Sequence, residues 1–181
     1  ERMSTPSSKL ENKITEMRRL FDESFAIALP EEVAKPEPML AITLEGEHFA
    51  LRVGEISGLA TSEEKIVPVP SRVPELIGLT GIRGKVVPVF SLARLLGFDS
   101  ERGQVRWLVF CGERHAPIAL AFEAMERLFE VPSSELFARG EASGRCYVNA
   151  TVCEGTMLRG VISIPTVVEY IKSRGASERR K

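Results

Sequence analysis

Short segments in which apolar and polar residues alternate recur through most of this chain, and turn residues separate them. In the first segment Leu40, Ile42 and Leu44 alternate with small or polar neighbours, and residues 45–47, Glu-Gly-Glu, predict a tight turn into a second alternating segment. Short strands at regular intervals bury their apolar faces by packing as a sandwich or as small barrels. The pattern therefore predicts a mainly β fold.

The predicted strands form two consecutive sets, and a short helix that opens with a serine follows each set. The first helix begins at Ser91 and ends at Gly97, and the second covers Pro165–Lys172 behind Ser163, because serine caps helix starts and glycine ends helices. Residues 135–145 are expected to form a loop. The predicted strands lie at residues 40–44, 49–53, 56–60, 66–69, 76–80, 85–90, 105–111, 118–122, 125–131, 148–152 and 157–164.

A separate segment precedes the predicted strands. Residues 7–29 are expected to form an amphipathic helix, because apolar residues recur every three or four positions from Leu10 to Phe25. The apolar face of this helix either packs on the body of the protein or docks a partner helix. The expected divisions are an N-terminal helix and Pro-rich linker at 1–38, a body at 39–172 with halves 39–98 and 105–172, and a basic tail at 173–181.

Composition narrows the classes of function. The 181 residues carry 24 basic and 25 acidic side chains, a balance that does not favour nucleic acid as a partner. No apolar run approaches the ~20 residues that a membrane span requires, and the polar start lacks a signal-peptide core. We therefore expect a cytoplasmic protein without direct membrane insertion. The three cysteines, Cys111, Cys146 and Cys153, are expected to be small buried hydrophobic residues.

Residues with reactive or metal-binding side chains do not form an interpretable cluster. His48 and His115 have no second ligand at metal-binding spacing, and nothing orients His115 as a base for Cys111, although that pair stays open. Residues 78–85 resemble a phosphate-binding loop, but Val86 stands where a magnesium-binding hydroxyl is needed. We expect no catalysis, no metal and no cofactor. The alternatives are a small β-barrel enzyme or ligand-binding protein and a nucleic-acid-binding barrel.

One segment carries a specific motif. Residues 78–97 read Gly-Leu-Thr-Gly-Ile-Arg-Gly-Lys-Val-Val-Pro-Val-Phe-Ser-Leu-Ala-Arg-Leu-Leu-Gly and resemble the signature of CheW-like domains. The resemblance extends at the level of pattern over residues 39–172. The matching positions are Gly78, Arg83, Gly84, Pro88, Val89, Leu92 and Gly97.

This resemblance implies two five-stranded SH3-like β-barrels side by side, with short helices. It also implies a non-enzymatic adaptor in chemotaxis or motility signalling. The groove between the barrels would receive the cytoplasmic hairpin tip of a methyl-accepting chemoreceptor, and an end surface would pair with the regulatory domain of a CheA-type histidine kinase. An accessory CheW-like protein of a gliding-motility (Frz-type) pathway is a variant of this interpretation. The candidate protein-binding residues are Ile56, Gly58, Gly78, Leu79, Gly81, Arg83 and Gly84.

Arg83 and Gly84 stand at a turn between two apolar segments. Gly84 can adopt a positive φ without steric cost, and the planar guanidinium of Arg83 can bind carboxylates or backbone carbonyls. Two roles for Arg83 stay open, a direct contact with a partner and an internal salt bridge that pins the hairpin.

The chain departs from the family pattern at several positions. Gly81 stands where the family usually has Asn, and Gly58 stands where an acidic residue is frequent, so the usual carboxylate partner of Arg83 is missing. Ser91 and Ser163 stand where Asp is usual, and serine is also a good N-cap, so both helices are expected to form without that negative charge. We expect one of the two implied interfaces to be weakened, and the kinase-facing one in particular.

Overall fold

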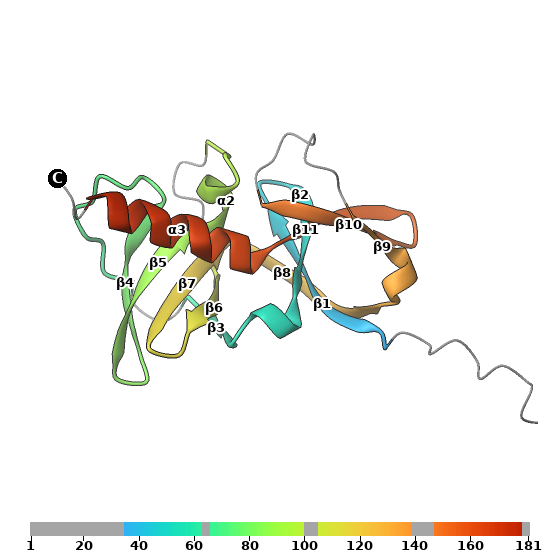
Figure 1. Cartoon of the computed structure of the whole chain (residues 1–181), viewed down its shortest axis with the longest axis horizontal. Helices are drawn as coiled ribbons and strands as arrows, with labels where there is room; N and C mark the ends of the chain where they lie inside the picture. The colour runs from blue at the N-terminus through green and yellow to red at the C-terminus, as the bar shows by residue number, and fades with distance from the viewer. Residues whose placement is uncertain (1–34, 63–65, 100–104, 139–146, 179–181) are drawn as a thin grey trace, which may run out of the picture. The chain divides into compact units, whose positions relative to one another are not determined.

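Strands dominate the computed structural model, which describes residues 35–62, 66–99, 105–138 and 147–178 (Figure 1). The mainly β prediction is confirmed, whereas the helix predicted at 7–29 and Cys146 lie outside the described residues. The elements are β1 (Glu37–Leu44), β2 (Glu47–Arg52), η1 (Val53–Glu55), β3 (Gly58–Thr61), β4 (Leu76–Ile82), β5 (Lys85–Ser91), α2 (Leu92–Leu95), β6 (Trp107–Glu113), β7 (Ala116–Phe122), β8 (Ala124–Val131), η2 (Ser133–Glu135), β9 (Leu136–Ala138), β10 (Val148–Glu154), β11 (Met157–Ile162) and α3 (Ile164–Glu178).

The described strands form two sheets, and sheet A combines the first two strands with the last four. Sheet A has the order β8-β1-β2-β11-β10-β9, and sheet B has the order β3-β6-β7-β5-β4. In each sheet the second strand of an early hairpin pairs in parallel with a later strand, β2 with β11 and β5 with β7. Each sheet therefore takes strands from both of the expected halves, 39–98 and 105–172, because the edge of β2 pairs with β11 while β3 joins the other sheet.

Three local predictions also need correction. Residues 66–69 contribute one antiparallel bridge, Val67 with Leu79, because two prolines in and beside this stretch lack the N–H groups that a ladder needs. The short strand β9 pairs with β10 in the stretch expected to be a loop. Helix α3 continues to Glu178, so it includes most of the residues expected to form a basic tail.

Both predicted hairpin turns are confirmed. Glu45–Gly46 and Arg83–Gly84 are two-residue connections with positive φ at both residues, 49° and 79° in the first turn and 47° and 74° in the second. This backbone matches the twist of the flanking strands, and glycine adopts it without steric cost. Glu45 and Arg83 have a Cβ and lack that freedom, so the paired strands on both sides must hold them in the left-handed conformation.

Alternation along the strands divides the apolar residues among three cores. The largest core lies between the two sheets and includes residues of α3, which crosses the face of sheet B in Figure 1. On β7, Ile118 and Leu120 pack into this core, whereas Ala119 and Ala121 face the separate core of sheet B. A third core lines the opposite face of sheet A. The shared core therefore holds the two sheets against each other.

Sheet A curls strongly enough to bring β8 against β11. Two strands separate β8 from β11 in the sheet order, so they would lie about 14 Å apart if the sheet were flat. Instead the Arg159 guanidinium on β11 donates hydrogen bonds of 3.0 and 2.6 Å to the two carboxylate oxygens of Glu126 on β8. Glu126 is the extra residue of a β-bulge, a device that re-aims a side chain.

An ion network surrounds Arg159, whose side chain is only 2% exposed. Arg159 also donates to Glu154 at 2.9 Å, and Glu126 accepts a hydrogen bond of 2.6 Å from the Thr43 hydroxyl and lies 2.9 Å from His48 Nδ1. The hydrogen bonds from Arg159 are the main reason that the pKa of Glu126 is held at about 2, below its ordinary value of 4.5. The network ties β8, β1 and β2 to β10 and β11.

Helices α2 and α3 begin with different caps. Ser91 caps α2 as predicted, because its Oγ accepts a hydrogen bond of 3.4 Å from the Arg94 N–H. At the start of α3 the carboxylate of Glu55, which comes from η1, accepts a hydrogen bond of 2.9 Å from the Ile164 N–H. A carboxylate at this point also interacts favourably with the helix dipole. Glu55 therefore links the segment that follows β2 to the C-terminal helix.

Replacing Glu55 by alanine is expected to lower the free energy of unfolding by about 1 kcal/mol, since a capping side chain at a helix N-terminus contributes that much. Denaturant unfolding of both proteins measures the change. Glu169→Ala serves as the control, because Glu169 is exposed within the same helix. If both variants lose the same stability, the contact between Glu55 and Ile164 is not the cause.

Candidate protein-binding grooves

The structure brings two of the predicted binding residues, Gly58 and Arg83, to one groove. Gly58 lies on β3 and Arg83 lies in the turn after β4, and these two strands are the opposite edges of sheet B. The groove has a volume of about 660 Å³. We name it the hairpin groove and define it by Gly58, Leu59, Ile82, Arg83, Phe110 and Arg114.

The hairpin groove carries more basic than acidic side chains. Lys85 and Arg114 line it together with Arg83, and the carboxylate that lines it, Glu113, is bound by Lys172 at 2.6 Å. The hydrogen bond from Lys172 lowers the pKa of Glu113. The sequence motif points to Arg83 alone. Lys85 and Arg114 join it only because β5 and β7 are parallel neighbours, which places the turns before them at the same end of sheet B.

The guanidinium of Arg83 is exposed, and within the residues that the structure describes it makes no ion pair or hydrogen bond. The internal salt bridge considered from the sequence is therefore absent from this part of the chain. Across the groove, Gly58 contributes no side chain, and a Cβ added there would contact only the Phe110 ring at 3.6 Å. The groove consequently has room beside Arg83 for a group from outside.

The other predicted binding residues serve the fold of sheet B or lie on the hairpin itself. Gly78 is buried, and a Cβ there would lie 2.4 Å from the carbonyl oxygen of Val67. Leu79 forms the backbone bridge with Val67, and Ile56 packs against the core between the sheets. The two exposed glycines of the hairpin are Gly81 and Gly84.

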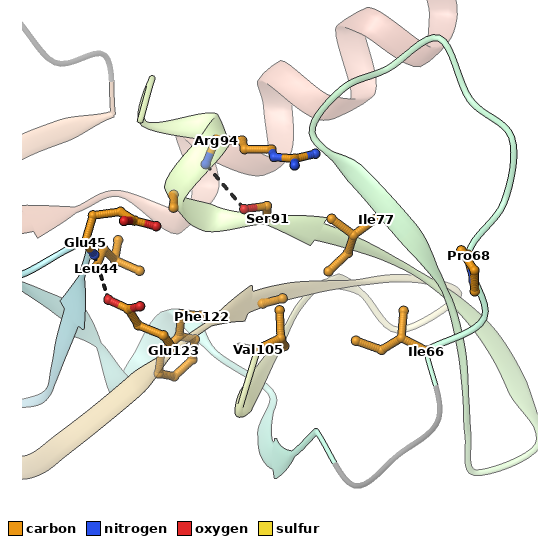
Figure 2. Close-up of a pocket in the computed structure, with 12 residues that line it drawn as sticks. Leu44, Glu45, Ile66, Pro68, Ile77, Ser91, Arg94, Val105, Phe122 and Glu123 are labelled. Atoms are coloured by element: carbon orange, nitrogen blue, oxygen red, sulfur yellow. Dashed lines mark hydrogen bonds between the residues drawn. The ribbon is translucent and has the colours of Figure 1, made fainter. Parts of the chain in front are cut away.

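A second cavity, of about 270 Å³, lies where the β1–β2 turn of sheet A meets sheet B (Figure 2). We name it the inter-sheet cavity. The Glu45 N–H donates a hydrogen bond of 2.7 Å to Glu123 Oε1, which fixes the turn at the edge of the cavity. Figure 2 shows Leu44 beside this pair, with Ile77 and Arg94 on the side of sheet B. The cavity thus combines apolar walls with the charged side chains of Glu45, Arg94 and Glu123.

Cys111 and His115, considered from the sequence as a nucleophile and its base, are not paired. Cys111 is buried, burial raises its pKa to about 12, and its Sγ contacts the Ile118 carbonyl oxygen at 3.6 Å. His115 is exposed and lies 2.8 Å from Glu113. A thiol with that pKa stays protonated at neutral pH and is a poor nucleophile. Cys153 is partly exposed rather than buried, because it lies at the end of β10 beside a turn.

Neither a metal-binding cluster nor a membrane-spanning helix is found in the described part of the chain. Among the described residues, no three His, Cys, Asp or Glu side chains gather where they could hold a metal ion. No helix in the same part of the chain is both long and apolar enough to cross a membrane.

The comparison with protein families identifies the class. Residues 38–168 match the CheW-like domain, so the chain belongs to the family of CheW-like domains. Among solved structures it is similar to the scaffolding protein TtCheW from Thermoanaerobacter tengcongensis, with a TM-score of 0.63 and 16% sequence identity over 71% of this chain and 90% of that chain. At this identity the likeness shows the fold alone. A comparison with curated protein sequences found no match.

Proposed function

We propose that this protein is a non-enzymatic adaptor that couples methyl-accepting chemoreceptors to a CheA-type histidine kinase in the cytosol. The observation that carries the proposal is the membership of residues 38–168 in the CheW-like family, to which the related structure of a scaffolding protein adds support. The function would be geometric, because the adaptor holds two partners in a fixed relation and performs no reaction itself.

Each partner is assigned to one surface. We propose that the inter-sheet cavity receives a side chain from the hairpin tip of the receptor, since it lies between the two sheets and has apolar walls. The hairpin groove, at one end of sheet B, would contact the regulatory domain of the kinase. The curl of sheet A, seen in the bond between Arg159 and Glu126, supports SH3-like barrels as the rigid bodies that carry both surfaces.

The kinase-facing interface is proposed to be the weaker of the two. Arg83 has no partner within the described residues, so its guanidinium must be ordered and desolvated when the kinase domain binds, which costs affinity. An accessory role in a gliding-motility (Frz-type) pathway would suit an adaptor with one strong and one weak interface. The N-terminal segment would then supply an additional contact.

Titration calorimetry with two separate ligands tests this function, a receptor hairpin-tip fragment and the regulatory domain of the kinase, both from the source organism. We expect both to bind, the kinase domain more weakly. Arg83→Glu is expected to weaken the kinase complex by about tenfold, since reversing a charge at a complementary interface costs on the order of 1.4 kcal/mol or more. The same reversal at exposed Arg72, outside both cavities, is the control. Binding of neither ligand would refute the adaptor function, and equally tight binding of both would refute only the weakened interface.

A further inference from the structure

We propose that a partner completes the hairpin groove with a carboxylate. In this proposal an Asp or Glu side chain of the kinase regulatory domain, next to an apolar side chain, pairs with Arg83. The inference rests on the adaptor function proposed above and goes further, because it names the chemical group that the groove recognises.

The backbone at Arg83 gives the first argument. With a φ of 47°, Arg83 occupies the first central position of a two-residue hairpin turn, where Asn, Asp or Gly is favoured. A residue with a Cβ is strained in this conformation, and strain of this kind gathers at ligand-binding sites. No interaction of the guanidinium within the described residues offsets it. An external group that binds the guanidinium would account for arginine at this position.

The charges around the groove give the second argument. Lys85 and Arg114 flank Arg83, and Lys85 Nζ donates to the Arg114 carbonyl oxygen at 2.9 Å. Glu113, which also lines the groove, is already bound by Lys172 and His115 and so is engaged elsewhere. Among the described residues, no other carboxylate lines the groove to neutralise these three basic groups. An acidic group is the complementary occupant.

The floor of the groove gives the third argument. Leu59 and Phe110 line it, and Leu59 is 39% exposed. An apolar side chain beside the carboxylate would cover this surface and exclude water from the ion pair. A guanidinium and a carboxylate paired in such surroundings form two parallel hydrogen bonds, which are stronger than those of an exposed lysine.

The first test separates the fold from the binding of the kinase domain. Arg83→Asn is expected to raise the midpoint of thermal unfolding, because asparagine suits this turn, and to weaken binding of the kinase regulatory domain by about tenfold. Arg83→Lys keeps the charge but loses the planar fork and is expected to give an intermediate affinity. If the wild-type protein does not bind the domain, the adaptor function fails and this inference fails with it. If the wild-type protein binds and Arg83→Asn binds equally well, only this inference fails.

The second test places a carboxylate in the groove from within the chain. A side chain at position 58 has room, since an added Cβ meets only Phe110 at 3.6 Å. Gly58→Glu is expected to weaken the kinase complex more than Gly58→Gln, because the new carboxylate pairs with Arg83 or repels the carboxylate of the partner. The two side chains have the same length, so the difference reports charge. Equal affinities for the two variants would overturn the proposal.

Discussion

Replacing Arg159 by methionine is expected to lower the free energy of unfolding by about 2 kcal/mol, because it removes the hydrogen bonds that join a buried guanidinium to two carboxylates, and hydrogen bonds between charged groups are stronger than those between neutral groups. The substitution removes three hydrogen bonds and leaves Glu126 and Glu154 without the positive charge that lies between them. It also removes the contact between β8 and β11 that reveals the curl of sheet A. Equilibrium unfolding in urea measures the loss.

Arg127→Met is the matched control for this substitution. Arg127 pairs with the same Glu154 carboxylate, but its side chain is 61% exposed, whereas that of Arg159 is 2% exposed. Exposed ion pairs contribute less than about 1 kcal/mol, so this variant is expected to stay close to the wild type. Equal losses from the two variants would contradict the importance given to burial.

The same network makes stability depend on pH in acid. The pKa of Glu126 is about 2 in the folded protein, chiefly because Arg159 donates hydrogen bonds to it, and its ordinary value is 4.5. A carboxyl whose pKa is lowered by folding stabilises the protein above its unfolded pKa, and this stabilisation is lost as the pH falls from 4.5 towards 2. The difference in the free energy of unfolding between the wild type and Arg159→Met should therefore have its full size near neutral pH and decrease as the pH falls through this range. A difference that does not change with pH would exclude Glu126 as the carboxylate responsible.

The hairpins could be predicted from the sequence because their signals are local. At residues 45–46 and 83–84 a glycine follows a polar residue between two alternating segments, and both turns form as expected. The start of α2 is local in the same way, since a serine at position 91 caps the backbone three residues ahead. Elements whose hydrogen bonds join residues only a few positions apart can be recognised from the local sequence.

The assignment of strands to sheets could not be predicted in this way. The pairing of β2 with β11 joins Phe49 to Gly160, which are far apart in the chain. The alternation of residues along a strand shows that its two faces pack into two different cores, but it does not show which strand lies beside it. Two consecutive sets of strands satisfy the same alternation. The choice between two consecutive sets and the observed sheets depends on which strand edges pair, and no local sequence signal indicates this.

The sequence contains one sign of the ion network, but this sign can be interpreted only when the pairing of the strands is known. Arg159 stands two residues before Val161, on the same face of β11, so a charged residue occupies a position whose neighbours are buried. A buried charge of this kind requires an ionic partner. Its partner, Glu126, is the extra residue of a β-bulge, which alternation within β8 does not reveal.

The candidate site was predictable in part. The motif identifies Arg83, and the structure places Arg83 and Gly58 on one groove. In contrast, Gly78 and Leu79 make contacts within sheet B. A glycine in a motif has two explanations that a single sequence does not separate, an open binding surface and a close approach of the backbone. A Cβ added to Gly58 would meet only the Phe110 ring, whereas one added to Gly78 would clash with the backbone of Val67.

Gly78→Ala is therefore expected to lower the free energy of unfolding by about 2 to 3 kcal/mol, through overpacking and the loss of two backbone hydrogen bonds. The new Cβ would lie 2.4 Å from the Val67 carbonyl oxygen and 2.9 Å from Ile66 Cγ2. The first of these atoms belongs to the backbone, so the segment must withdraw as a whole. Its two bonds of 2.8 Å, from the Val67 N–H to the Leu79 carbonyl and from the Leu79 N–H to the Val67 carbonyl, are then lost.

Gly81→Ala supplies the control, because it makes the same substitution three residues further along the same strand. No atom lies within 4 Å of a Cβ built on Gly81, and the residue is exposed. A surface substitution of this kind changes stability by less than about 0.5 kcal/mol. Urea unfolding of both variants compares them directly. Hydrogen exchange at the Leu79 amide should also accelerate in Gly78→Ala and not in Gly81→Ala, since only the first substitution displaces Val67. Similar stabilities for the two variants would mean that the approach of Val67 to Gly78 does not hold this segment in place.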